Sequence, residues 1–185
     1  ADIRQLLERG RADALRGVNS RLFDRVRRLP MPTIALLDGY ALGGGAELAY
    51  ACDFRIGTAS VRIGNPEPGL GIMAAAGATW RLVELIGEPL AKEVLLAGRV
   101  LRADEAHEIH LLNEIVEPDD LVDAGHRWAD RIAQQDPLAI RLTKTVFHAP
   151  RDAHPLAEEL AQAILFETEA KTERMTAFLE RKKKP

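Results

Sequence analysis

Three consecutive glycines, Gly43 to Gly45, precede a short apolar segment that contains Glu47. Glycines leave backbone N–H groups uncovered, and the first N–H groups of a helix have no acceptor within it. Such donors favour a developing negative charge, so the loop fits an oxyanion hole, in which fixed donors face the oxygen that becomes charged in a transition state. A tight turn between a strand and a helix is the alternative, and it is the commoner meaning of three glycines taken alone.

Two glutamates near this loop have residue types suited to proton transfer. Glu47 falls in the first turn of the helix predicted after the glycines, and Glu67 stands between Pro66 and Pro68 in a rigid loop. Two carboxylates beside one substrate can hold a water molecule and exchange its proton with carbon. Burial and mutual repulsion would move their pKa values apart. A helix-dipole partner at Glu47 and a solvated acid at Glu67 are the alternatives.

Other motifs indicate chemistry less well. Residues 69–74 fit G-x-G-x-x-A, but a dinucleotide loop directly follows a strand, and Pro66 and Pro68 stand in the way. The two serines lie outside any G-x-S-x-G motif, which argues against a serine hydrolase. His107 and His110 lack a third ligand nearby, so we expect no metal site.

The composition limits the function classes. With 185 residues, of which 46% are hydrophobic, the chain can bury one sizeable core. A net charge of −3 gives no sign of nucleic-acid or membrane-surface binding, and the single cysteine, Cys52, excludes a disulfide framework. No apolar run approaches the length of a membrane helix, so we expect a cytoplasmic protein, although a chain that begins with Ala1 leaves any leader unjudged.

Short strands are predicted mainly in the first third of the chain and helices in the rest, which favours an α/β or α+β layout. We predict strands at 33–37, 54–57, 61–63 and 114–116. We predict one Arg-rich amphipathic helix over 3–29, a short helix over 46–52, and helices at 78–86, 89–97, 103–111, 119–134, 137–147 and 156–181. So few strands make a poor sheet for so many helices, so we expect that the sequence begins partway into its own domain.

The order of residues between Pro32 and Asp53, with Gly39-Tyr40-Ala41-Leu42-Gly43-Gly44-Gly45-Ala46-Glu47 at its centre, resembles the signature of the crotonase superfamily, the enoyl-CoA hydratase/isomerase group. The match continues at Pro66-Glu67, Leu70-Gly71, Arg81-Leu82, Ala97-Gly98-Arg99 and Glu173 to Arg181, and so spans essentially the whole chain. The resemblance implies an α/β, crotonase-like spiral of βαβ units over residues 1–117. It also implies a C-terminal helical trimerisation region over 118–185, a homotrimer or dimer of trimers, and an acyl-CoA thioester substrate.

The same resemblance implies roles for individual residues. One oxyanion donor would be the N–H of Gly44, and the second would be the N–H of Ala1, because Ala1-Asp2-Ile3 looks like the end of the family's A-x-A-D-I stretch, which also places Ile3 at the substrate. Glu47 would hold the attacking water, and Glu67 would exchange a proton with the α-carbon. The N–H of Ala75 would help to place the water, and coenzyme A contacts would fall near Phe178 and Arg181.

The implied reaction is syn hydration of a trans-2-enoyl-CoA, which needs no cofactor because coenzyme A is part of the substrate. Three departures from the family pattern bear on it. Ala74-Ala75 stands where Pro-Gly is frequent, Trp80 stands where Gln is frequent, and the family has a further segment before the stretch matching Ala1. An indole at position 80 would narrow the acyl pocket or pack on the next helix. The alternatives are isomerisation, thioester hydrolysis, or a non-catalytic acyl-CoA-binding protein.

Overall fold

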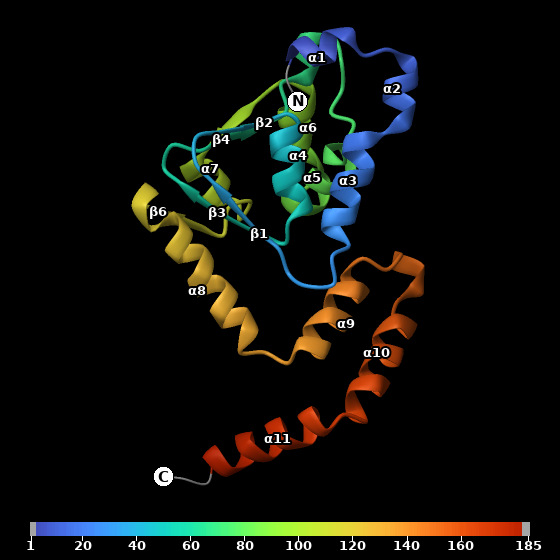
Figure 1. Cartoon of the computed structure of the whole chain (residues 1–185), viewed down its shortest axis with the longest axis vertical. Coiled ribbons are helices and arrows are strands. Elements are labelled where there is room, and N and C mark those ends of the chain that lie inside the picture. The colour runs from blue at the N-terminus through green and yellow to red at the C-terminus, as the bar shows by residue number, and fades with distance from the viewer. Residues whose placement is uncertain (1–2, 183–185) are drawn as a thin grey trace. The chain divides into compact units, whose positions relative to one another are not determined.

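The computed structural model describes residues 3–182, which form two compact units (Figure 1). The first unit holds residues 3–29 and 33–129, and the second holds residues 30–32 and 130–182. The glycines Gly43 to Gly45 and the two glutamates Glu47 and Glu67 all belong to the first unit. The second unit consists of helices and their connections.

The first unit repeats a strand–corner–strand–helix pattern. Strands β1 (Ile34–Leu37) and β2 (Tyr40–Leu42) are followed by helix α4 (Gly44–Ala51), and then by β3 (Phe54–Thr58) and β4 (Arg62–Gly64). β3 lies parallel to β1, and β4 lies parallel to β2. Each turn of the chain therefore adds one strand to each of two sheets, and α4 is the crossover between consecutive turns.

A third turn completes both sheets. β5 (Val100–Arg102) pairs with β4 in the antiparallel direction, and β6 (Glu114–Val116) pairs with β3 in the parallel direction. The two sheets have the strand orders β1-β3-β6 and β2-β4-β5. The predicted mixed α/β class is confirmed.

The corner between strands is held by side chains that stack from one turn to the next. One carboxylate oxygen of Asp38 accepts hydrogen bonds from Thr58 Oγ1 and from Ser60 Oγ, both at 2.7 Å. The N–H of Gly39 donates to Ser60 Oγ at 2.8 Å. These bonds fix the point at which the chain leaves one sheet for the other.

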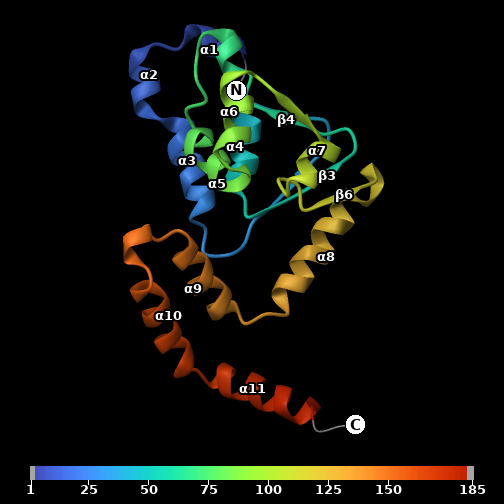
Figure 2. The same cartoon turned by 180° about the vertical axis from the view of Figure 1, so that it is seen from behind.

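Helices cover the sheets and build the core of the first unit. They include α3 (Val18–Arg27), α5 (Ala78–Ile86), α6 (Glu88–Leu96) and α7 (Ala103–Glu108), while α8 (Leu121–Ala133) leads out of the unit. In both views α4 lies beside α3 and α5 (Figure 1, Figure 2), and it contacts both. The fully buried Ala46 and Ala49 of α4 keep its inner face small enough for this close packing.

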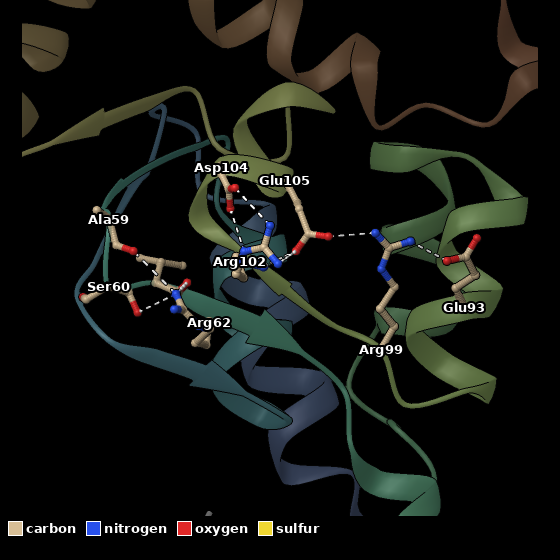
Figure 3. A network of polar contacts seen from close by, with 9 residues as sticks. Ala59, Ser60, Arg62, Glu93, Arg99, Arg102, Asp104 and Glu105 are labelled. Atoms are coloured by element: carbon tan, nitrogen blue, oxygen red, sulfur yellow. Dashed lines mark hydrogen bonds and ion pairs between the residues drawn. The ribbon is translucent and has the colours of Figure 1, made fainter.

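The antiparallel edge of the second sheet sets two arginines opposite each other, Arg62 on β4 and Arg102 on β5. Like charges facing across a ladder are destabilising unless each is drawn elsewhere. Arg62 donates to the carbonyl groups of residues 59–61, whereas Arg102 pairs with Asp104 and Glu105 (Figure 3). Arg99 joins Glu105 to Glu93 of α6 and so ties α7 to α6.

The prediction of one helix over residues 3–29 is wrong. The structure has α1 (Ile3–Glu8), α2 (Arg11–Arg16) and α3 in its place. Gly10 is the extended residue before α2, and Gly17, with φ of 57°, separates α2 from α3. A residue in the left-handed conformation cannot continue a right-handed helix, so the helix is broken there. The apolar periodicity continues across the break, and for this reason the sequence predicted a single helix.

The prediction of one helix over residues 156–181 is also wrong. The second unit contains α9 (Pro137–Phe147), a 3-10 turn (Arg151–Ala153), α10 (Leu156–Phe166) and α11 (Glu169–Lys182). Thr168 separates the last two helices, and its hydroxyl accepts the N–H of Lys171 at 3.2 Å, as a residue that starts a new helix does. The predicted bounds of α9 are confirmed.

The strand predictions are confirmed at β1, β3, β4 and β6, but β2 and β5 were not predicted, and the described residues contain six strands in all. Each of the two has three residues, as β4 and β6 also have, so strand length alone does not explain why they were missed. The helix predicted at 46–52 starts earlier, at Gly44, and that predicted at 103–111 ends earlier, at Glu108. No helix among residues 3–182 is long and apolar enough to cross a membrane.

The carboxyl end of α4 is held by a buried arginine. Arg55 is 3% exposed, and its guanidinium donates to the carbonyl oxygens of Cys52 at 2.7 Å and Leu111 at 2.6 Å, with a longer bond to Ala49. Burial, followed by the charge of Arg81, lowers the pKa of Arg55 to about 10, so the group is still protonated at neutral pH. A cation at this end of a helix also opposes the partial negative charge there.

Replacing Arg55 with Met should lower the free energy of unfolding by about 3 kcal/mol, because buried carbonyl groups would lose their donors. Arg25→Met, at an exposed site on α3, is the matched control and should change it by less than about 0.5 kcal/mol. Urea denaturation followed by circular dichroism measures both. Equal losses in the two variants would contradict this account of Arg55.

Candidate active site

The start of α4 depends on a backbone conformation that glycine supplies. Gly43, just before the helix, has φ of 57° and ψ of −126°. Its N–H donates to the carbonyl oxygen of Gly64 at 2.9 Å, and its own carbonyl accepts the N–H of Glu47 at 3.0 Å. Gly44 is the first residue of α4, so its N–H belongs to the turn whose donors have no acceptor within the helix.

Glu47 lies in the first turn of α4, where the sequence places it, and is 5% exposed. Its Oε1 accepts the backbone N–H of Ala76 at 2.7 Å and that of Ala78 at 3.2 Å. Burial raises the pKa of this carboxyl, the two N–H donors oppose that effect, and the nearby charge of Glu67 adds to it. The net shift of the pKa is upward.

Glu67 is the first residue of a 3-10 turn, Glu67–Leu70, and Pro68 fixes the backbone directly after it. The side chain is 8% exposed. Asn65 Nδ2 lies 3.5 Å from Oε1, whereas Oε2 is buried and accepts no hydrogen bond from the described residues. A β-carbon added at Gly43 would stand 3.1 Å from Glu67 Oε1, so the glutamate lies against the residue that starts α4.

Two buried polar residues that the sequence analysis did not single out complete this group. The hydroxyl of Tyr50 donates to Asn65 Oδ1 at 3.2 Å, and both side chains are at most 1% exposed. Because a phenol donates to the amide oxygen, the amide nitrogen of Asn65 is turned toward Glu67. Burial raises the pKa of Tyr50, and the charges of Glu47 and Glu67 raise it further. The available signal was a tyrosine one turn after Glu47 on a helix whose other residues are glycine, alanine and leucine.

A cavity of about 620 Å³ opens beside Glu47. Its walls come from α3, from α4 and from residues 73–81, and the predicted Ala75 lines it. Neither Glu67 nor Gly44 is among the described residues that line it. The size suits a small organic group, since ligand cavities commonly measure about 300–1,000 Å³.

The remaining predicted residues lie elsewhere in the chain. Ala1, the predicted second oxyanion donor, lies outside the described residues. Ile3 begins α1 with its side chain 65% exposed and does not line the cavity. Phe178 and Arg181 are on α11, in the second unit. Among residues 3–182, no three His, Cys, Asp or Glu side chains form a group that could hold a metal ion.

The arrangement can hold a water molecule and move protons. One carboxylate is anchored by two backbone donors, and a second has one buried oxygen without a donor. Both lie near a helix start, where backbone N–H groups favour negative charge. The roles assigned to these residues stay predictions, although the structure brings Glu47, Glu67 and Gly43 together.

The backbone at Gly43 generates a stability prediction. Gly43→Ala should lower the free energy of unfolding by about 2 kcal/mol, because a β-carbon is strained at these angles and presses on Glu67. Gly45→Ala is the matched control: its β-carbon would meet nothing within 4 Å, and alanine favours a helix by up to about 1 kcal/mol. Urea denaturation of both variants is the measurement, and a stability loss in Gly45→Ala equal to that in Gly43→Ala would contradict the explanation.

The raised pKa of Glu47 predicts a pH dependence. A carboxyl whose pKa is higher in the folded state than its ordinary 4.5 favours folding while it is protonated, and that contribution is lost as the pH rises through the folded pKa. Glu47→Gln keeps an oxygen for the two N–H donors but carries no charge. The variant should therefore gain stability relative to the native chain between about pH 4 and about pH 8. Unfolding free energies across that range test this, and a constant or shrinking difference would refute it.

Comparison with known proteins identifies the architecture. The whole chain, residues 1–185, matches the sequence profile of the family described as enoyl-CoA hydratase/isomerase. A crotonyl-CoA hydratase of Syntrophomonas wolfei is 39% identical over 90% of this chain and 65% of its own length. A short-chain-enoyl-CoA hydratase of Clostridium acetobutylicum is 37% identical over 99% of this chain and 72% of its own length.

A solved structure shows the same spiral of strands and helices. The crystal structure of an enoyl-CoA hydratase from Bacillus anthracis superposes with a TM-score of 0.90 at 33% identity, over 98% of this chain and 72% of that one. This chain thus spans about two thirds to three quarters of the length of these relatives. The profile match over all residues, with the shared fold, shows that the chain belongs to the enoyl-CoA hydratase/isomerase family, the crotonase superfamily.

Proposed function

We propose that the protein of this chain is an enoyl-CoA hydratase, a hydro-lyase that adds water to a trans-2-enoyl-CoA thioester. The observation that carries the proposal is the burial of two glutamates beside one helix start, with Glu47 fixed by two backbone donors. Relatives named as hydratases of crotonyl-CoA and of short-chain enoyl-CoA support it. No cofactor is needed, because the thioester already activates the double bond.

The proposed mechanism uses the two carboxyl groups differently. Glu47 holds the attacking water through the oxygen that its backbone donors leave available. The water oxygen bonds to C3 while its proton passes to Glu47, the C2–C3 π electrons shift toward the thioester, and the carboxyl group of Glu67 gives its proton to C2. Because the two groups work on the same face, the addition is syn. The product is the 3-hydroxyacyl thioester, and the proton delivered to C2 is balanced by the one that water loses.

The thioester oxygen gains negative charge during this step, and backbone donors stabilise it. The N–H of Gly44 is one proposed donor, supported by its place in the first turn of α4. The second proposed donor is the N–H of Ala1. Loss of one such donor costs about 3 kcal/mol of transition-state stabilisation, so we expect the turn before α4 to tolerate little change.

We also propose that copies of this chain associate as a homotrimer or a dimer of trimers, and that Phe178 and Arg181 contact coenzyme A. Large apolar side chains exposed on the helices of the second unit support association. They are Leu156, Leu160, Ile164 and Phe166 on α10, and Met175, Phe178 and Leu179 on α11. Each of them is at least 51% exposed.

The proposed activity is tested by the loss of ultraviolet absorbance of crotonyl-CoA. The native protein should consume the conjugated double bond, and Glu67→Gln should lower kcat by about 10²–10⁴-fold, because general acid–base catalysis typically supplies that much. Binding of the saturated butyryl-CoA, which cannot be hydrated, should persist in the variant.

The outcomes separate the alternatives. Unchanged turnover in Glu67→Gln would remove this residue from the mechanism. Binding of thioester without any loss of absorbance would favour another crotonase reaction or a binding protein. Formation of a shifted double bond in place of a 3-hydroxyacyl product, detected by mass spectrometry because water adds mass, would identify an isomerase.

A further inference from the structure

The cavity beside Glu47 has a charged wall. Among the described residues that line it, Arg27, Arg28 and Arg81 are cationic, and Asp24 and Glu47 are acidic. Arg27 and Arg28 stand at the end of α3, whereas Glu47 belongs to α4. If the bound acyl chain were purely hydrocarbon, it would desolvate the guanidinium groups on the wall of its pocket without offering them a hydrogen-bond acceptor, which is unfavourable.

The two arginines of α3 share one carboxylate. Arg27 Nη2 lies 3.2 Å from Asp24 Oδ1, and Arg28 Nε lies 2.7 Å from Asp24 Oδ2. Burial works to raise the pKa of Asp24, but hydrogen bonds from Arg28 and Arg27 outweigh it, and the net shift is downward. Asp24 is therefore ionised at neutral pH, and the α3 wall of the cavity carries two positive charges and one negative charge among its described residues.

The guanidinium of Arg27 is held in place rather than free to swing into solvent. Its side chain is 11% exposed, and its central carbon lies 4.9 Å from the centroid of the Trp80 ring, a cation–π distance. Trp80 itself lines the cavity. The indole at position 80 thus packs against α3 through Arg27, and the pair forms a preorganised cationic surface.

We propose that this wall recognises an anionic group on the acyl part of the substrate, so that the preferred thioester carries a carboxylate at the end of a short acyl chain. This inference rests on the proposed function, because it takes the cavity beside Glu47 as the acyl site. A planar guanidinium matches a carboxylate through paired hydrogen bonds, and little solvent competes at an 11% exposed side chain. Arg27 is the specificity-determining residue, and Trp80 and Asp24 position it.

Equilibrium binding of two saturated thioesters tests the proposal without using the hydration reaction. Glutaryl-CoA differs from butyryl-CoA only by a terminal carboxylate, and neither has a double bond to hydrate. By isothermal titration calorimetry, the native protein should bind glutaryl-CoA at least about tenfold more tightly, equivalent to about 1.4 kcal/mol. Arg27→Gln should bring the ratio of the two dissociation constants to about one, since a neutral amide lacks the charge.

Arg25→Gln is the matched control, because Arg25 is exposed on the same helix and does not line the cavity, and it should keep the native ratio. Arg27→Lys keeps a charge without the planar fork and should give an intermediate ratio. If Arg27 instead contacted the phosphates of coenzyme A, Arg27→Gln would weaken the binding of both thioesters equally. The ratio of the two dissociation constants would then stay at its native value, and the proposal would be overturned. Equal affinities in the native protein, or a preference that survives in Arg27→Gln, would also overturn it.

The hydration assay separates this inference from the proposed function. A protein that hydrates crotonyl-CoA but binds the two saturated thioesters equally overturns the carboxylate preference and leaves the hydratase proposal standing. One that prefers glutaryl-CoA in an Arg27-dependent way, yet hydrates nothing, supports the specificity and overturns the reaction. A protein that binds neither saturated thioester and does not hydrate crotonyl-CoA overturns both.

Discussion

The position of α4 is the constraint on which the rest of the site depends. At its amino end, the turn at Gly43 precedes the first N–H groups of the helix and the buried Glu47. At its carboxyl end, Arg55 binds carbonyl groups that would otherwise be buried without donors, and Arg81 donates to the carbonyl of Tyr50. A helix of eight residues has little stability of its own, so these contacts and its small inner residues determine where it lies.

The chemistry depends on a balance between burial and backbone donation. A carboxylate as buried as Glu47 would be driven toward its neutral form, since burial penalises charge. The N–H groups of Ala76 and Ala78 limit that shift, while the neighbouring Glu67 adds to it. Glu67 is held differently, by one long contact from Asn65, with its second oxygen buried. Two carboxyl groups of the same kind thereby occupy unequal environments, which suits unequal roles.

The sequence could predict the parts of this arrangement that leave a local pattern. Apolar runs located β1 and α9, and Glu47 and Glu67 were found beside a glycine loop and a proline-flanked loop. The breaks at Gly10 and Gly17 were missed because apolar periodicity continues across them. Strand β2 was missed because Gly39 and Gly43 stand on either side of it, and glycines indicate turns. The donors at Ala76 and Ala78 are backbone groups, which any residue except proline supplies, so no side-chain pattern indicates them. The Tyr50–Asn65 bond joins residues whose proximity only the fold creates.

The loop after Glu67 shows which departures from a family pattern the fold tolerates. Ala74-Ala75 replaces a frequent Pro-Gly pair, yet the next residues still present two N–H groups to Glu47. The requirement on this loop is therefore the direction of the backbone at Ala76 and Ala78. Proline at either position would remove a donor, whereas alanine at 74 and 75 removes none. Trp80 is a departure of another kind, because it changes what lines the cavity by bringing a ring beneath Arg27. Ala74 and Ala75 also line the cavity, so what separates the two departures is that the alanines leave both anchoring N–H groups in place, whereas Trp80 adds a ring that contacts a charged side chain of α3.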